Sequence, residues 1–127
     1  MKALYYIIVV LFITGCDPEQ TVTFKVNNQT QYNTEMTLYS KGVVNKSFQI
    51  KKSTSVVIFT DSGLSPESFQ TNDYDSIRFI FENNKVLVFV NDTVNSPNDI
   101  YNGDNWLVET KKHTQIFTYT LDNKLIE

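Results

Sequence analysis

Apolar and polar residues alternate along several short segments of this chain, which is the period expected of a half-buried β-strand. In residues 21–26, for example, Val22, Phe24 and Val26 fall on one face. Tyr and Phe, which suit the surface of a pleated sheet, are frequent at 7 and 9 residues. No segment after residue 20 shows the period of an amphipathic helix. We therefore expect a fold built from strands.

The alternating segments predict about eight short strands in a single domain. The clearest hairpin joins 76–81 to 86–90 through a polar connection, and Asn-Asn-Gln-Thr at 27–30 is typical of a turn. The apolar run at 56–59 predicts a short, fully buried strand. Closely spaced short strands favour an all-β fold, a small antiparallel β-sandwich, with a small β-barrel as the alternative. The expected strands are 21–26, 35–40, 43–50, 56–59, 76–81, 86–90, 106–108 and 115–121.

The N-terminus has a different pattern. Lys2 gives a positive start, and residues 3–13 are uncharged and mostly apolar, a stretch too short to span a bilayer as a helix. It ends in Ile13-Thr14-Gly15-Cys16, which resembles the lipobox of bacterial lipoproteins. The resemblance implies that residues 1–15 are a signal peptide, and that Cys16 becomes the lipidated first residue of the mature chain. The residues that the signal peptidase would recognise are Ile13, Thr14 and Gly15.

This resemblance implies a location. Acyl chains such as palmitate on Cys16 would hold the protein in a lipid bilayer, since two or more chains anchor a protein stably. Residues 16–20 would form the tether and 21–127 the β-sandwich domain. We expect a membrane-anchored protein of the cell envelope, at the outer membrane. The domain loosely resembles small β-sandwich lipoproteins of Bacteroidota, and that resemblance implies no particular activity.

The sequence offers little for catalysis. His113 is the only His, it follows two lysines, and it is most simply a solvated turn residue. No Gly-x-Ser-x-Gly motif or glycine-rich phosphate loop is present, and one His with one lipidated Cys cannot make a zinc site. A net charge of −3 without a basic cluster argues against nucleic acid as a partner. We therefore expect a protein that is not an enzyme and has no cofactor.

Two uses of the loop carboxylates remain open. Asp92, Asp99 and Asp104 crowd one long loop and are a weak candidate for a Ca²⁺ site, because Ca²⁺ takes several oxygen ligands. A pair of loop carboxylates, including Asp73 and Asp75, could also serve a small hydrolase. Asp is equally an ordinary turn residue, because its side chain bonds the local backbone.

Two long polar loops, 61–74 and 91–105, are the expected places for recognition. If their aromatic side chains are exposed, they could contact a protein or glycan ligand. Alternatively, the Trp begins a strand and packs in the core. The preferred function is a non-catalytic binding or structural module. The alternatives are a periplasmic inhibitor or immunity-type lipoprotein and, third, the carboxylate-dependent hydrolase. The candidate ligand-binding residues are Phe69, Tyr74, Tyr101 and Trp106.

Two tripeptides, Asp75-Ser76-Ile77 and Asp92-Thr93-Val94, resemble the O-glycosylation motif of Bacteroidota. The resemblance implies glycans on Ser76 and Thr93, which would add bulk and solubility to the surface. Ser76 adjoins an expected strand, where a glycan would be hard to place.

Overall fold

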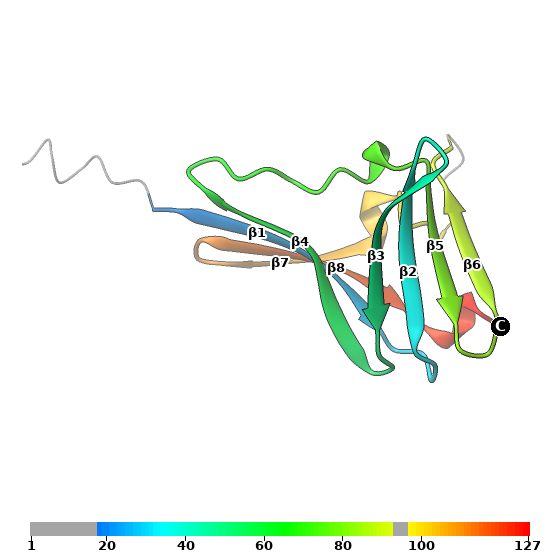
Figure 1. The fold of residues 1–127 in the computed structure, drawn as a ribbon. Helices are drawn as coiled ribbons and strands as arrows, with labels where there is room; N and C mark the ends of the chain where they lie inside the picture. The colour runs from blue at the N-terminus through cyan, green and yellow to red at the C-terminus, as the bar shows by residue number, and fades with distance from the viewer. Residues whose placement is uncertain (1–17, 93–96) are drawn as a thin grey trace, which may run out of the picture.

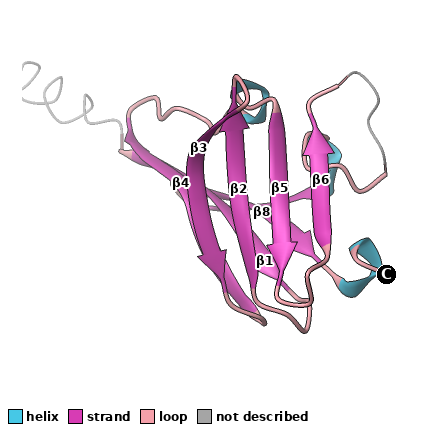
Figure 2. Ribbon diagram, turned by 45° about the vertical axis from the view of Figure 1, so that its right-hand side comes forward, coloured by secondary structure: helices cyan, strands magenta, loops and turns pink. Residues whose placement is uncertain are grey.

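The computed structural model describes residues 18–92 and 97–127, which form two four-stranded sheets packed face to face (Figures 1 and 2). Three short 3-10 helices lie in the connections, and no helix in the described part of the chain is long and apolar enough to cross a membrane. The elements are β1 (Gln20–Asn28), β2 (Thr34–Ser40), β3 (Val43–Ile50), β4 (Thr54–Gly63), η1 (Thr71–Asp73), β5 (Ser76–Phe81), β6 (Val86–Val90), η2 (Gly103–Asn105), β7 (Trp106–Lys111), β8 (Thr114–Leu121) and η3 (Asn123–Leu125).

The strand order is β4-β1-β8-β7 in the first sheet and β3-β2-β5-β6 in the second. All neighbouring strands are antiparallel except β1 and β8, which run parallel with Phe24 beside Phe117. The expected all-β sandwich is confirmed, and the described strands form two open sheets rather than a closed barrel. The first strand begins at Gln20, one residue before the expected start, and continues to Asn28.

The core lies between the two sheets and is filled by the inward residues of the alternating strands. Val26, Leu38, Ile77 and Phe79 are fully buried there. The hairpin of β5 and β6 has the bounds that the sequence predicted. Burial of these side chains supplies the main driving force for folding, at roughly 1.5–3 kcal/mol for each large apolar side chain.

β4 corrects one expectation. The run at 56–59 belongs to a longer strand, and Val57 is 51% exposed while Ile58 is 5% exposed. The reason is that successive residues of a strand point to opposite faces, and Val57 points to the outer face of the first sheet while Ile58 points inward. A bulge opposite Phe24 and Lys25 shifts the register between β1 and β4 at this point.

Asn28 joins the two sheets at the end of β1. Its side chain is fully buried, and its Nδ2 donates to the carbonyl oxygens of Tyr32 at 2.9 Å and Ile50 at 3.3 Å. Its Oδ1 accepts from both the backbone N–H and the hydroxyl of Thr30, at 3.0 and 2.7 Å. The segment 27–30, which the sequence predicted as a turn, therefore also contains a buried polar side chain, Asn28, that has hydrogen-bond partners for both its amide nitrogen and its amide oxygen.

The first sheet is longer than the second. At the end where β1 begins, β1, β4, β7 and β8 extend past the second sheet, and the segment after β4 runs back over them (Figure 1). The inward face of this projecting part is therefore covered by loops.

Candidate functional site

A cluster of aromatic rings lies on the inward face of the projecting part. Its centre is Phe24 on β1, which is 6% exposed. The ring of Phe24 stacks on Phe117 of β8 with centroids 4.4 Å apart. It also contacts Trp106, Phe69 and Phe59 at centroid distances of 5.5, 5.6 and 6.2 Å. All four strands of the first sheet and one loop thus contribute a ring to this cluster.

The four candidate aromatic residues converge here, but not as exposed rings. Phe69, Tyr74 and Trp106 are only 7, 9 and 8% exposed, and Tyr101 is half-buried. Phe69 and Tyr74 stack at 5.6 Å, and the Tyr101 hydroxyl donates to the Tyr74 carbonyl at 3.0 Å. Three of the four rings therefore lack the exposure that direct ligand contact would need, because these loops cover sheet surface that the second sheet does not reach.

The loop before β7 is held against the core by side chains. The indole N–H of Trp106 donates to the carbonyl of Ile100 at 2.8 Å, and the Tyr119 hydroxyl donates to the carbonyl of Asn98 at 2.7 Å. Asn105 Nδ2 donates to the carbonyl of Asp99 at 2.8 Å. The alternative reading of Trp106 is confirmed, since it begins β7 and packs in the core. These bonds fix the described part of the loop, 97–105, in one shape.

Burial also keeps the phenols of this region neutral. It raises the pKa of Tyr101 and of Tyr119 far above the usual value, and the carboxylate of Asp99 raises both further. Asp99 is itself buried, and its Oδ1 accepts from the backbone N–H of Tyr101 at 2.9 Å. Both phenols therefore stay protonated beyond the alkaline pH at which a free phenol ionises, and they remain hydrogen-bond donors to the loop carbonyls.

A hollow of about 220 Å³ lies between the two loops, over the aromatic cluster. None of its lining residues carries a charge. The sequence pattern indicated that Phe24 and Phe117 face inward, but not that they share a site. Neither segment carries a signal for the parallel pairing of β1 with β8 that brings the two rings together. The lining residues are Phe24, Phe117 and Trp106 from the strands, and Ser68, Phe69, Gln70, Thr71, Tyr101 and Gly103 from the loops.

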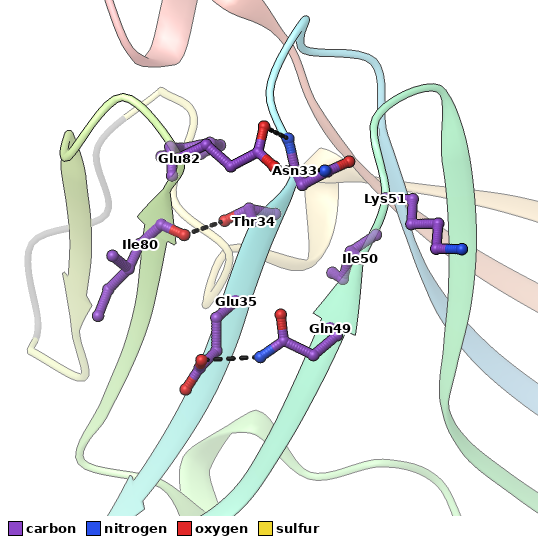
Figure 3. Close-up of a pocket in the computed structure, with 9 residues that line it drawn as sticks. Asn33, Thr34, Glu35, Gln49, Ile50, Lys51, Ile80 and Glu82 are labelled. Carbon is purple, nitrogen blue, oxygen red and sulfur yellow. Dashed lines mark hydrogen bonds between the residues drawn. The ribbon is translucent and has the colours of Figure 1, made fainter.

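A larger hollow of about 400 Å³ lies at one end of the second sheet, and two carboxylates line it (Figure 3). Glu35 accepts hydrogen bonds from Gln49 Nε2 at 2.7 Å and the Ser47 hydroxyl at 3.1 Å, and these bonds lower its pKa. Glu82 accepts from both the backbone and side-chain nitrogen of Asn33. A general acid needs a raised pKa, so the shift at Glu35 has the wrong direction for a glycosidase acid.

The loop aspartates do not form the Ca²⁺ site considered from the sequence. Within 18–92 and 97–127, no three His, Cys, Asp or Glu side chains are grouped to hold a metal ion. Asp99 points inward to the Tyr101 N–H, whereas Asp104 is exposed in η2. Asp92 is also exposed, so the three carboxylates do not share a site. The physical reason is that Asp and Asn in these loops shape the local backbone.

The other candidate residues are mostly surface or terminal. Ser76 begins β5, between Tyr39 of β2 and Val90 of β6, so strands flank it on both sides. His113 is an exposed residue in the β7–β8 turn, as expected. The lipobox residues, including Cys16, and Thr93 lie outside the described residues.

Comparisons with known proteins give no family for this chain. Searches of protein-family models, curated proteins and solved structures found no match. We therefore infer function from the chemistry and geometry of the residues alone.

Proposed function

We propose that this chain is a lipid-anchored, non-catalytic binding module of the bacterial cell envelope, whose hollow between the two loops receives an apolar side chain of a partner protein. The observation that carries the proposal is the aromatic hollow of about 220 Å³, bordered by a loop that core side chains hold in place. Pockets for drug-sized ligands have about 300–1,000 Å³, so this hollow suits a single side chain or ring.

The lining favours an apolar group over a sugar. A sugar would stack on an open ring face, but Phe24 and Trp106 are only 6 and 8% exposed. The polar lining groups, such as Ser68 and Thr71, are neutral and few. A partner protein commonly places one apolar side chain in a dry pocket at the centre of its interface, and that contact carries much of the binding energy.

The structure favours concave recognition over the inhibitor alternative. An inhibitor of that kind would insert a projecting loop into an enzyme. In the described part of the second loop, Ile100 is fully buried and Asp99 is 5% exposed, so this part lies against the core. We do not propose the hydrolase, because the loop carboxylate of Asp75 accepts from the backbone N–H groups of Gly42 and Lys41, and these bonds lower its pKa, the wrong direction for a general acid.

The anchor is tested by cell fractionation. We expect the wild-type chain in the membrane fraction, and a Cys16→Ala variant unprocessed or released, because the thiol of Cys16 is the only one that can carry the lipid. Protease treatment of intact and opened cells then tells which side of the envelope the domain faces. Normal processing and membrane retention of Cys16→Ala would refute the anchor.

The hollow is tested by filling it. Gly103 lines it, a side chain there would meet open space, and its φ is not positive, so Gly103→Phe should block the hollow without unfolding the domain. Ser55→Phe, at an exposed position of β4 outside the lining, is the control. Indole and a methyl glucoside serve as probes in an NMR titration.

We expect indole to shift the amide signals of 68–71 and 101–103 in the wild type and in Ser55→Phe, but not in Gly103→Phe. If only the glucoside shifts these signals, the proposed apolar side chain is wrong and the hollow binds a glycan instead. No shift with either probe would count against the hollow as a binding site.

A further inference from the structure

The β7–β8 turn lies at the tip of the projecting part, beside the start of β1 (Figure 1). β7 ends at Lys111 and β8 begins at Thr114, so only Lys112 and His113 connect them, and Lys111, Lys112 and His113 are all exposed. The carbonyl of His113 accepts a hydrogen bond from the backbone N–H of Thr21 at 2.8 Å. The turn is thus fixed directly to the second residue of the N-terminal strand.

This place in the fold has a consequence for the lipid anchor. Cys16 lies four residues before Gln20, and four residues span at most about 14 Å even when extended. A lipid on Cys16 would therefore keep the start of β1 within about 14 Å of the bilayer surface. The attraction between a lysine and an anionic surface extends over a Debye length of about 8–10 Å. The turn lies beside the start of β1, so it comes within that range when the tether is shorter than its full extension.

We propose that Lys111 and Lys112 contact the anionic headgroups of the phospholipid bilayer in which the lipid on Cys16 is inserted, so that the domain is held at two points and keeps one orientation. This inference rests on the proposed lipid anchor. Leu64, which is 73% exposed, follows directly after Gly63, the partner of Gln20 in the sheet, and adds an apolar group to the same end. Lipid-modified proteins commonly use a second, basic signal of this kind.

Acidic groups also lie near this end and oppose the attraction. Glu19 is exposed, and Glu109 lies two residues back from Lys111 along β7, about 7 Å farther from the tip. Glu109 pairs with Ile116 on β8, so it belongs to the side of the sheet rather than to the turn. Asp17 and Glu19 lie in the tether itself, and Asp61 of β4 pairs with Val22, so the two lysines are the basic groups of an end that also carries acidic ones.

The chain contains a matched internal control. Lys51 and Lys52 form a second exposed Lys-Lys turn, followed by Ser53, between β3 and β4. The next residue, Thr54, pairs with Asn28 at the far end of β1, about 26 Å from Gln20. Equal charge changes in the two turns therefore differ only in their distance from the proposed anchor.

The experiment uses the lipidated protein, reconstituted in phosphatidylglycerol vesicles that contain a headgroup-linked fluorescence quencher. Cys16 is the only Cys, so a fluorophore can be attached through His113→Cys or, as the control, Ser53→Cys. We expect the fluorescence of the label at position 113 to be quenched about three times as strongly as that of the label at position 53. Lys111→Gln with Lys112→Gln, or roughly 1 M salt, should reduce that quenching, whereas Lys51→Gln with Lys52→Gln should not.

Flotation of the vesicles separates the two proposals. If the protein does not float with phosphatidylcholine vesicles, the lipid anchor is absent and this inference is overturned with it. If it floats but both labels are quenched equally, the anchor stands and the turn does not contact the bilayer. Quenching at 113 that survives the loss of both lysines would overturn the electrostatic contact, because the tether alone would then explain the proximity.

Discussion

The inward face of the first sheet is covered in two different ways. Toward the end of β1, Val26 and Asn28 lie under the second sheet, and Tyr119 of β8 meets Phe89 of β6 at 6.1 Å. Toward its beginning, Phe24 and its neighbours lie under loops. The same strands thus have one part covered by another sheet and one part covered by irregular chain.

The difference explains where a binding site can form in so small a domain. Two sheets that pack face to face interdigitate to the density of an organic crystal and leave little space. Loops cover a surface less evenly, and here they leave the hollow over Phe24 and Phe117. Recognition is therefore expected where the first sheet extends past the second, at a hollow whose base is formed by strands and whose sides are formed by loops.

The largest effect should come from a cavity between the sheets. Phe79 is fully buried there, so Phe79→Ala should lower the free energy of unfolding by about 3–5 kcal/mol. Phe69→Ala, under the loop, should cost about half as much, because the loop can settle into the space. Urea denaturation followed by circular dichroism measures both. Equal losses would mean that the two parts of the face are equally well packed.

Asn28→Ala should come next. It removes the acceptor of the Thr30 backbone N–H and the Asn28 donor to the carbonyls of Tyr32 and Ile50, at about 1–3 kcal/mol for each buried group left unsatisfied. We expect a loss of about 3 kcal/mol in the same denaturation assay. Asn27→Ala is the control, because the Asn27 side chain accepts an exposed hydrogen bond from Ser55, and its loss should be about 0.5 kcal/mol or less. Similar losses for both variants would contradict the role of Asn28 as the link between the sheets.

Local alternation was enough to predict most strands, because each half-buried strand carries its own period of two. β5 and β6 have the predicted bounds for this reason. The parallel pairing of β1 with β8 joins segments about ninety residues apart, and nothing in either segment specifies it. In β4 the apolar run did not indicate which residues face inward, and the fold places Val57 on the outer face of the first sheet.

The sequence predicted the loop residues of the candidate site, but not the strand residues Phe24 and Phe117 that lie beneath them. Phe69, Tyr74, Tyr101 and Trp106 stood out as aromatic residues in or beside polar loops, and they do meet. Their burial depends on how far the first sheet extends past the second, which sequence pattern does not give. Gly103 carries no local signal at all, and it matters because it leaves space in the wall of the hollow.

Tyr101→Phe should loosen the loop-covered part selectively. It removes the hydrogen bond from the Tyr101 hydroxyl to the Tyr74 carbonyl, which joins the two loops, at about 1 kcal/mol. Hydrogen exchange should accelerate in 98–105 and 71–74, while the amides of β2 and β5 stay protected. Tyr32→Phe is the control, because its hydroxyl accepts an exposed hydrogen bond from Gln31. Faster exchange throughout both sheets would contradict the separation of the two parts.

The smallest effect should appear at Asp75, where the first loop joins the second sheet. Its two carboxylate oxygens accept from the backbone N–H groups of Gly42 and Lys41, at 2.8 and 2.9 Å, and these bonds lower its pKa below the usual 3.8. A lowered pKa means that the ionised group stabilises the folded state above the unfolded pKa and that this contribution disappears as the pH falls through the folded value.

Asp75→Asn should therefore reduce stability slightly at pH 7 and give a shallower loss of stability between about pH 4.5 and 3. Thermal unfolding across that range measures both slopes. Parallel curves would mean that Asp75 does not stabilise the β2–β3 turn, and that the loop is joined to the second sheet mainly by the backbone bonds of Asp75 to Tyr39 and Asn91.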